Sequence, residues 1–391
     1  MPNSDQSSAF LAPQERFEAI AAKAFRGFGP RLVDLSYANP YDGPDEVVLD
    51  ALKGALQENR DLDFQYSPYG GRTVTRRAIA SQLSQAYELP FNFRDIIMTP
   101  GAMAGLNVAF RSLFEGGGEL IVLVPCWLDY PLYLENLSVP FRFVPLASDK
   151  HLDFDALLNA IDQNTRGIIL SNPGCPSGVI LNEGELQRLS ALLKEKAKLF
   201  GSDIYLIGDE VHKDIIWKDE SFCSVLKCHP NSLSIYSFGK SFLLQGQRIG
   251  YLAVNPLDPN REVLRESLLR NVRRMGFCTP TGLMQKAVLK LLTHRPALDG
   301  IARQQAYLRS ELAGMGYDVC DAGGTFFIYA KSPVADDMAF SEFLGEKGVL
   351  VLPSSIFHEE GYFRISLTAK KEALETCLPA FAEARKMESG G

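Results

Sequence analysis

The sequence has no apolar run of the roughly 20 residues that a helix needs to cross a bilayer. Its first residues show no basic stretch followed by an apolar core, so no secretion signal is predicted. Positive charge is not in excess, because 40 Lys and Arg face 47 Asp and Glu, for a net charge of -7. Binding nucleic acid needs a basic face. We therefore expect a cytoplasmic protein with neither a membrane nor a nucleic-acid partner.

Cysteine patterns are equally uninformative. The seven cysteines are scattered and odd in number, which disfavours a disulfide framework. Cys223, Cys228 and His229 lie close together, but no second ligand pair follows at a fitting distance, so no metal site is predicted. The phosphate-binding patterns GxxxxGK(S/T) and GxGxxG after the first strand are also missing, which argues against a nucleotide-binding enzyme.

What the sequence does contain is a regular alternation through its middle. The 391 residues exceed one ordinary core, so two domains are expected. Short β-rich apolar runs alternate with helical periodicity, which is typical of an α/β domain with a mostly parallel sheet. The apolar runs are 120–124, 167–171, 205–208 and 233–237, and the helical segments include 46–59, 72–87 and 183–199.

The pattern changes after about residue 285. A long helical stretch is expected at 285–314, followed by short apolar segments such as GGTFFIYA and GYFRISL. This change predicts a smaller α+β domain that packs with the N-terminal segment. We therefore predict a large domain at 45–285 and a small domain formed by 1–44 and 286–391.

Polar residues follow three of the predicted strands directly. Residues 171–178 (SNPGCPSG) follow the first, 209–212 (DEVH) the second, and 237–240 (SFGK) the third. In open α/β sheets, ligands bind beyond the carboxyl ends of the strands. A lysine, an aspartate and a glycine-rich polar turn are therefore expected to converge on one crevice.

The segment YSFGKSFLLQGQRIGY carries the most informative of these residues. Lys240 stands in a turn of small residues after a buried strand, whereas an ordinary lysine would be a solvated surface charge. A lysine among apolar neighbours loses proton affinity, and its neutral amine can attack an aldehyde. Arg248, flanked by glycines, suits a phosphate group.

These motifs resemble the fold-type I pyridoxal 5′-phosphate (PLP) enzymes of aminotransferase class I and II, over about residues 31–368. The resemblance implies an aspartate aminotransferase-like fold with a large PLP-binding domain and a small α+β domain. It implies that Lys240 holds PLP as a Schiff base, and that Ser237 and Arg248 bind its phosphate. Asp209 matches the family's aspartate under the pyridine nitrogen, where a carboxylate keeps that nitrogen protonated. A helix N-cap is the alternative for this residue.

Two further segments match the cofactor-binding turns of the family. Gly101, Ala102 and Met103 open a helix, where backbone N–H groups can bind a phosphate. Met103 lacks the hydroxyl of many relatives, so a backbone contact is expected. Trp127 resembles the aromatic residue that stacks on the cofactor ring, with a core tryptophan as the alternative and Tyr130 as the second choice for stacking.

The resemblance also implies a homodimer with shared active sites. Tyr66, in the segment YSPYGG, matches the tyrosine that reaches the phosphate of the neighbouring subunit, with Tyr69 as its competitor. Arg364, in an apolar strand pattern, matches the arginine that grips the substrate α-carboxylate with two parallel hydrogen bonds. A structural ion pair is the alternative for Arg364. Ala38 takes the place of a glycine beside that carboxylate in many relatives.

Two departures from the family bear on the reaction. Cys175 replaces an asparagine and His212 replaces a tyrosine, the two usual donors to the 3′ oxygen of PLP. A thiol donates poorly, whereas an imidazole N–H can donate and can exchange protons near neutral pH. The replacements are either tolerated drift or a sign of a different reaction after Cα deprotonation.

The reaction expected from these residues is transamination, with an amino acid and a 2-oxo acid as substrates, as in amino acid metabolism and biosynthesis. The alternative is a PLP-dependent lyase or cyclase of the β/γ-elimination type, which Cys175 and His212 suggest. A regulatory DNA-binding protein on this fold is disfavoured, because the chain has no basic helix and no room for an added module before residue 31. The identity of the amino acid does not follow from the sequence.

Overall fold

A central seven-stranded sheet forms the larger part of the protein in a computed structural model that describes residues 9–41, 43–58, 61–217 and 220–390. Its strand order is β2-β8-β7-β6-β5-β3-β4. Neighbouring strands from β7 to β4 are parallel, and β8 runs antiparallel to both β7 and β2. The strands are β2 Ile96–Thr99, β3 Glu119–Val124, β4 Phe141–Pro145, β5 Thr165–Ser171, β6 Tyr205–Asp209, β7 Ser232–Ser237 and β8 Gly250–Val254. The mostly parallel sheet predicted from the sequence is confirmed.

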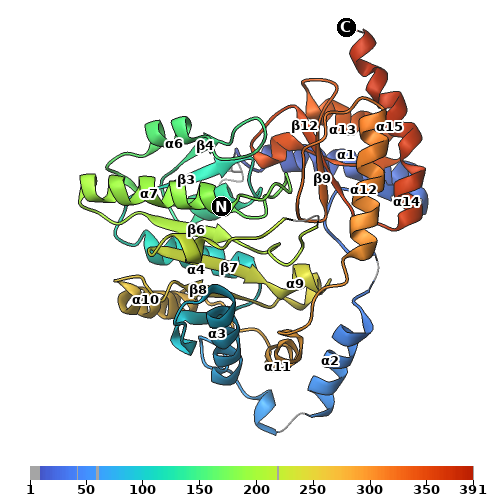
Figure 1. Cartoon of the computed structure of the whole chain (residues 1–391). Helices are drawn as coiled ribbons and strands as arrows, with labels where there is room; N and C mark the ends of the chain where they lie inside the picture. Colours follow the sequence, from blue (N-terminus) through green and yellow to red (C-terminus); the bar gives the residue numbers. More distant parts are fainter. Residues whose placement is uncertain (1–8, 42, 59–60, 218–219, 391) are drawn as a thin grey trace, which may run out of the picture.

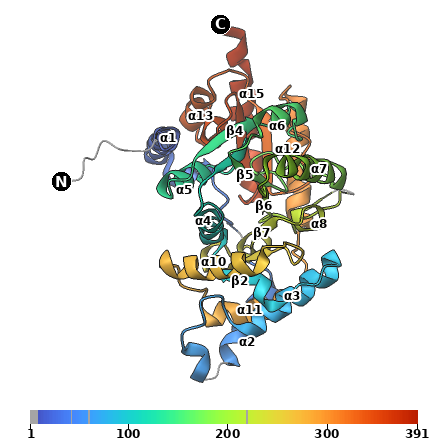
Figure 2. The ribbon, with the colours of Figure 1, turned by 90° about the vertical axis from the view of Figure 1, so that its left-hand side faces the viewer.

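Helices cover both faces of this sheet, which explains why its strands read as continuous apolar runs. Alternate residues of β3 enter different cores: Ile121 and Leu123 pack on one face, and Leu120 and Val122 on the other. Figure 2 shows α4 and α5 on one side of the strands and α7 and α8 on the other. The helices of this part are α3 Thr73–Tyr87, α4 Ala102–Leu113, α5 Tyr130–Asn136, α6 Phe154–Ala160, α7 Glu183–Phe200, α8 Val225–Cys228, α9 Phe238–Ser241, α10 Arg261–Arg274 and α11 Gly282–Leu291.

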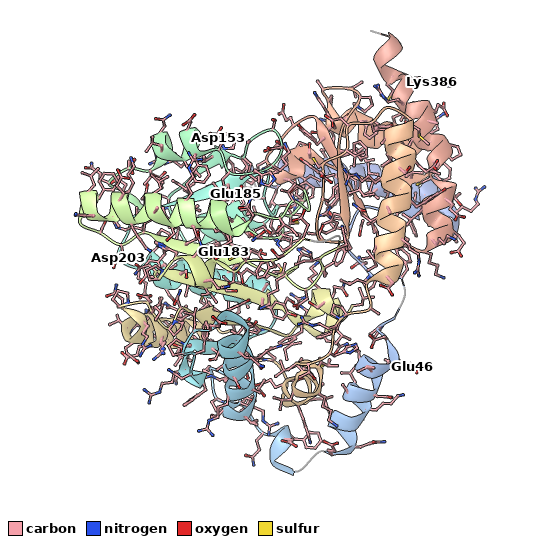
Figure 3. The ribbon with its side chains drawn as sticks, in the orientation of Figure 1. Glu46, Asp153, Glu183, Glu185, Asp203 and Lys386 are labelled. Atoms are coloured by element: carbon pink, nitrogen blue, oxygen red, sulfur yellow. The ribbon has the colours of Figure 1, made fainter. Side chains whose placement is uncertain are left out.

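Local capping fixes where several of these helices begin. Asp153 accepts hydrogen bonds from two amides at the start of α6. Asn182 and Glu185 form a reciprocal capping box at the start of α7. Figure 3 shows Asp153, Glu183 and Glu185 at these helix starts, where negative charge also complements the helix dipole.

The second part of the protein combines both ends of the chain. The antiparallel sheet β11-β12-β9 is joined by a short parallel pair of β1 and β10. Figure 1 shows the blue helix α1 among the orange and red elements of this part. The elements are α1 Ala12–Phe28, β1 Val33–Asp34, α12 Asp299–Gly314, β9 Phe327–Lys331, α13 Asp337–Glu346, β10 Val349–Leu350, β11 Leu352–Pro353, β12 Tyr362–Ser366, α14 Lys371–Thr376 and α15 Leu378–Ala384.

The helical stretch expected at about 285–314 is divided into two helices. Helix α11 ends at Leu291 and α12 begins at Asp299. Pro296 lies between them, and a proline lacks the N–H and restricts the residue before it, so the helix cannot continue through it. Helix α11 packs against α2 (Glu46–Gln57), so the predicted domain boundary at 285 falls inside a packed helix. The division into two domains stays a prediction, and residues 1–8, 42 and 391 of its small domain lie outside the described residues.

Short 3-10 helices complete the described chain. They are η1 Gly29–Arg31, η2 Asp61–Phe64, η3 Phe93–Asp95, η4 Gln245–Gln247, η5 Ser354–Phe357 and η6 Arg385–Gly390. Among the described helices, none combines the length and the apolar character that crossing a membrane requires.

Candidate active site

The carboxyl ends of β5, β6 and β7 bring the three polar segments together. These strands are neighbours and parallel, so Ser171, Asp209 and Ser237 end at the same edge of the sheet. Ser171 is the register partner of Asp209, and the Asn172 amide donates to the Asp209 carbonyl at 3.1 Å. The lysine turn follows Ser237 at this edge. The three segments therefore lie at one edge of the sheet, and a crevice shared by them stays a prediction.

Asp209 ends β6 as a buried carboxyl group with 6% of its surface exposed. Its Oδ2 accepts a hydrogen bond from the Tyr130 hydroxyl at 2.6 Å. Its Oδ1 is buried and has no hydrogen-bond partner among the described residues. Burial raises the pKa of Asp209 to about 6, although the Tyr130 hydrogen bond and the Lys240 charge oppose this. One oxygen is thus left to accept from a buried N–H donor, as the pyridine nitrogen assigned to it would require.

Lys240 lies in the single turn of α9 that follows β7. Ser237 caps this turn by accepting from the Gly239 amide at 3.3 Å. The Lys240 Nζ lies 5.6 Å from the centre of the Phe326 ring. Burial lowers the pKa of Lys240 to about 8. Its amine is still mostly protonated at pH 7, but it loses its proton far more readily than an ordinary lysine, as a nucleophilic or basic amine needs.

Gly101 and Arg248 lie in close contact at the start of α4, where the sequence predicts a phosphate site. Gly101 precedes α4 with φ 84° and provides no side-chain cap for the helix. A Cβ at this position would meet the Arg248 Nη2 at 2.6 Å, so only glycine lets the arginine approach. Arg248 donates to the Gln245 carbonyl at 2.8 Å, and Met103 Sδ lies 3.8 Å from its Nη2. In the described residues no carboxylate forms an ion pair with Arg248, so its charge is available to an anion at the helix start.

Arg364 lies in β12 with 1% of its surface exposed. Its Nη2 donates to the Ser36 carbonyl at 3.0 Å, and its guanidinium lies over the rings of Phe327 and Phe357 at 4.0 and 4.7 Å. Its Nε has no partner, and no described carboxylate pairs with it. The alternative of a structural ion pair therefore finds no support within the described chain. A buried guanidinium with an unused donor is suited to binding a substrate carboxylate.

Cys175 and His212 complete the buried surface near Arg364 and Lys240. The Cys175 Sγ lies 3.8 Å from the Arg364 Nη1. Both ring nitrogens of His212 are buried without a partner in the described structure, and its ring contacts Phe326 edge-on at 5.3 Å. Burial holds the pKa of His212 well below its usual range. A neutral imidazole has one N–H donor to give, and a buried polar group without a partner calls for an explanation such as a ligand.

Trp127 and Tyr130 differ in their burial and in their contacts. Trp127 is partly buried and packs against the apolar cores of both parts of the protein, together with Ala38 on one side. Tyr130 is almost fully buried and donates its hydroxyl to Asp209. The sequence predicts Tyr130 only as a possible stacking ring and does not predict this hydrogen bond. Nothing in the sequence signals it, because the two residues are 79 positions apart.

Tyr66 does not take part in the site of its own chain, because its side chain is fully exposed. Tyr69 is half exposed, and the guanidinium of Arg273 lies 5.4 Å from its ring centre. The predicted role of Tyr66 requires a second subunit, so that role stays a prediction.

Metal-binding geometry is not found in the described residues, which hold no group of three His, Cys, Asp or Glu side chains placed to bind an ion. The Sγ atoms of Cys223 and Cys228 lie 3.5 Å apart. His229 instead bonds to Ser190 at 3.0 Å and to the Ile204 carbonyl at 2.9 Å.

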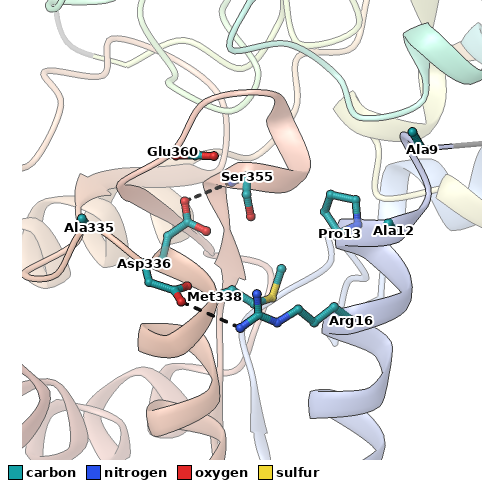
Figure 4. A pocket seen from close by; sticks show the side chains of 10 residues that line it. Ala9, Ala12, Pro13, Arg16, Ala335, Asp336, Met338, Ser355 and Glu360 are labelled. Atoms are coloured by element: carbon teal, nitrogen blue, oxygen red, sulfur yellow. Dashed lines mark hydrogen bonds and ion pairs between the residues drawn. The ribbon is translucent and has the colours of Figure 1, made fainter.

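A separate cavity of about 620 Å³ lies between the start of α1 and the loops around α13 (Figure 4). Arg16 and Asp336 form an ion pair at 3.8 Å on its wall. None of the residues predicted for the site lines this cavity. The candidate active site is therefore the strand-end cluster and not this surface pocket.

The sheet order and the lining of its carboxyl edge define an aspartate aminotransferase-like fold. The profile of the family described as aminotransferase class I and II matches residues 30–381, and the chain belongs to that family. It is thus an enzyme of the transferase class.

The known relatives agree with this assignment. The chain is 27% identical to an aspartate/prephenate aminotransferase of Thermus thermophilus, with 93% of this chain and 94% of that protein covered. It is also 27% identical to a probable N-acetyl-LL-diaminopimelate aminotransferase of Bacillus subtilis, with 88% and 86% covered. A solved amino transferase from Eubacterium rectale is similar in structure, with a TM-score of 0.90, 29% identity, and 96% and 95% of the two chains covered.

Proposed function

We propose that this enzyme transfers an amino group from an amino acid to a 2-oxo acid, with PLP held covalently by the Lys240 amine. The observation that carries the proposal is that Lys240 and Asp209 lie at the ends of adjacent strands. Lys240 has a lowered pKa, and Asp209 has a buried oxygen without a hydrogen-bond partner. Names of relatives support transamination over the lyase or cyclase alternative.

The side chains of the site fit this cofactor. Gly101, the first amides of α4, Ser237 and Arg248 would hold its phosphate. Asp209 Oδ1 would accept the N–H of its ring, which a carboxylate keeps protonated. When bound there, PLP supplies an aldehyde that accepts the substrate amino group and a protonated ring that takes up the electron pair left at Cα.

Further contacts to the cofactor are assigned to three more residues. The flat indole of Trp127 would cover one face of the ring. His212 would donate its N–H to the phenolic oxygen, with Cys175 as a weak second donor beside it. This assignment gives one of the two unpartnered ring nitrogens of His212 a partner.

The chain's own groups then divide the work on the substrate. Arg364 binds the α-carboxylate through two N–H groups, beside Ala38, and orients the Cα–H bond. The neutral Lys240 amine takes the proton from Cα and returns it to complete the transfer. Phe326, Phe327 and Phe357 surround these groups and keep water away from them.

A homodimer with shared sites belongs to the same proposal. Tyr66 is exposed in a segment where Phe64, Tyr69 and Val74 are also exposed, which leaves apolar surface to cover. In the dimer, Tyr66 of the partner subunit would reach the phosphate.

The test is a reaction with purified, PLP-loaded enzyme and a panel of amino acids. Without an acceptor, we expect about one 2-oxo acid per site, and with a 2-oxo acid present we expect sustained transfer of the amino group. Lys240→Ala should abolish both, while Lys227→Ala, which alters an exposed lysine, should leave them unchanged. Steady release of ammonia or thiol without an acceptor would refute transamination.

A further inference from the structure

The residue that follows Lys240 is bound to a carboxylate from the neighbouring strand end. Ser241 lies in α9 with 4% of its surface exposed. Its hydroxyl donates to the Oδ2 atom of Asp214 at 3.1 Å and lies 2.9 Å from the hydroxyl of Tyr236. Tyr236, in β7, also donates to the same Asp214 oxygen. One carboxylate oxygen therefore holds both α9 and the end of the strand that leads into it.

Asp214 belongs to the segment after β6 that also carries two residues assigned to the cofactor, Asp209 and His212. This segment forms a tight turn, because the Ile215 amide donates to the His212 carbonyl at 2.8 Å. Asp214 lies inside that turn, so its side chain starts from a fixed backbone position. The hydrogen bond from Ser241 thus ties the lysine turn to the segment that contains the other two residues.

A cation next to Asp214 completes this polar cluster. The Lys213 Nζ donates to the hydroxyls of Tyr251 at 2.9 Å and Tyr87 at 3.2 Å. It also lies 4.6 Å from the centre of the Tyr236 ring. Burial acts to lower the pKa of Lys213, but the two tyrosine oxygens and the charge of Asp214 outweigh it. Lys213 therefore stays charged, and Tyr236 is held at its ring by the cation and at its hydroxyl by the carboxylate.

No hydrogen bond from the described residues fixes the Lys240 amine directly, and the centre of the Phe326 ring lies 5.6 Å from it. Its position therefore depends on the turn that carries it. The four-residue α9 is too short to be stable as an isolated helix. Ser237 caps its start, but that hydroxyl is also assigned to the cofactor phosphate. Ser241 anchors the other end by a hydrogen bond for which the cofactor does not compete.

We infer that Asp214, acting through the Ser241 hydroxyl, holds the turn of α9 so that the Lys240 amine stays within reach of the substrate Cα. Asp214 and Ser241 are positioning residues, since neither is assigned a contact with substrate or cofactor. The inference rests on the proposed function and adds to it the groups that set the geometry of proton transfer. Proton transfer requires heavy atoms about 3 Å apart, so a turn that moves should slow this step and leave substrate binding by Arg364 unchanged.

The first measurement is hydrogen exchange in the cofactor-free protein. Ser241→Ala removes the hydroxyl, and Asp214→Asn removes the charge that accepts from it. Both variants should speed exchange of the amides in 239–244 by about tenfold and leave exchange in α7 unchanged. Tyr205→Phe is the matched control, because the Tyr205 hydroxyl also donates to an aspartate, Asp258 at 3.1 Å, but from the start of β6. This control should leave exchange at 239–244 unchanged.

The second measurement follows the first half of the reaction, in which the PLP-loaded enzyme converts the fastest amino acid of the panel to its 2-oxo acid. In both variants the maximal rate per bound PLP should fall about tenfold, while the amino acid concentration that gives half of this rate should change by less than about twofold. The isotope effect on the maximal rate, measured with the amino acid deuterated at Cα, should rise because proton transfer limits the rate more. The double variant should lose no more than the larger single loss, because both substitutions break the same hydrogen bond.

The outcomes separate this inference from the proposed function. If either variant keeps its maximal rate within about twofold, or if the rate falls without a larger isotope effect, Asp214 does not position Lys240 and transamination stands. Unchanged exchange at 239–244 in both variants would also refute the positioning role. If the unmodified enzyme binds PLP but converts no amino acid, the proposed function fails and this inference fails with it. Should one variant not fold, the other variant decides.

Discussion

In the cofactor-free protein, the buried Lys240 should lower the free energy of unfolding. The substitution Lys240→Met should raise that free energy. Burial lowers the pKa of Lys240 from 10.5 to about 8. A depression of this size corresponds to about 3 kcal/mol at pH 7, because each pKa unit is worth about 1.4 kcal/mol. Methionine has a similar length and no charge, so the variant should gain roughly this free energy of unfolding at pH 7.

The pH dependence gives the sign of the effect. Below pH 8 the lysine is charged in both the folded and the unfolded chain, so the full penalty applies. Between pH 8 and 10.5 the unfolded chain binds more protons than the folded one, so the stability of the unmodified protein rises with pH. Above pH 10.5 both forms are neutral, and the difference between the two proteins should vanish.

Urea denaturation of both cofactor-free proteins at equal concentration, at pH 7, 9 and 10.5, measures this difference. Lys213→Met is the matched control. Burial alone would lower the pKa of Lys213, but Tyr251, Tyr87 and nearby carboxylates outweigh it and raise the pKa well above its usual value. Its removal should therefore destabilise the protein at pH 7. The reasoning about Lys240 is refuted if Lys240→Met brings no gain at pH 7, or if its gain persists undiminished at pH 10.5.

Three other substitutions test the assigned contacts. Tyr130→Phe removes the hydroxyl that donates to Asp209, so the pKa of Asp209 should rise above about 6. Cofactor titration should then show PLP affinity reduced by about tenfold at pH 6.5 and by less at pH 8. Arg364→Lys keeps the positive charge but loses the planar guanidinium that can make two parallel hydrogen bonds, so kcat/KM for the amino acid should drop by about 100-fold while PLP affinity is unchanged. An equal loss of kcat/KM and PLP affinity would contradict the role of Arg364 in binding the substrate carboxylate. The double substitution Cys175→Asn and His212→Tyr should lower the pH midpoint of the bound cofactor's spectral change by about one unit, because both new side chains are better donors to the phenolic oxygen. An unchanged midpoint would show that residues 175 and 212 do not contact that oxygen.

The strands and their polar ends could be predicted because their signals are local. Buried parallel strands read as short apolar runs, and the polar residue that ends each run is visible in the sequence. Asp209 and Lys240 were expected at one edge for this reason: Asp209 ends β6, and Lys240 lies just after the neighbouring parallel strand β7. The predicted strands 167–171, 205–208 and 233–237 agree with the bounds of β5, β6 and β7 to within two positions.

Contacts that depend on how distant segments pack could not be predicted in this way. The bond from Tyr130 to Asp209 and the position of Asp129 against α1 depend on strand order and helix placement, which a single sequence does not contain. The antiparallel insertion of β8 between β2 and β7 has no local signal either. Pro296 does signal a helix break in the sequence, but the helical spacing of apolar residues continues on both sides of it and favours a single helical stretch.

The pairing of β1 with β10 has a consequence for synthesis on the ribosome. These strands are separated by about 300 residues of chain. Translation at about 5–20 residues per second therefore leaves the first segment waiting for about 15–60 seconds before its partner emerges. During that interval the apolar stripe of α1, with Phe17, Ile20 and Ala24, has no surface from α13 to cover it. Nascent chains of this enzyme should be captured by chaperones through this helix until the final quarter of the polypeptide is made.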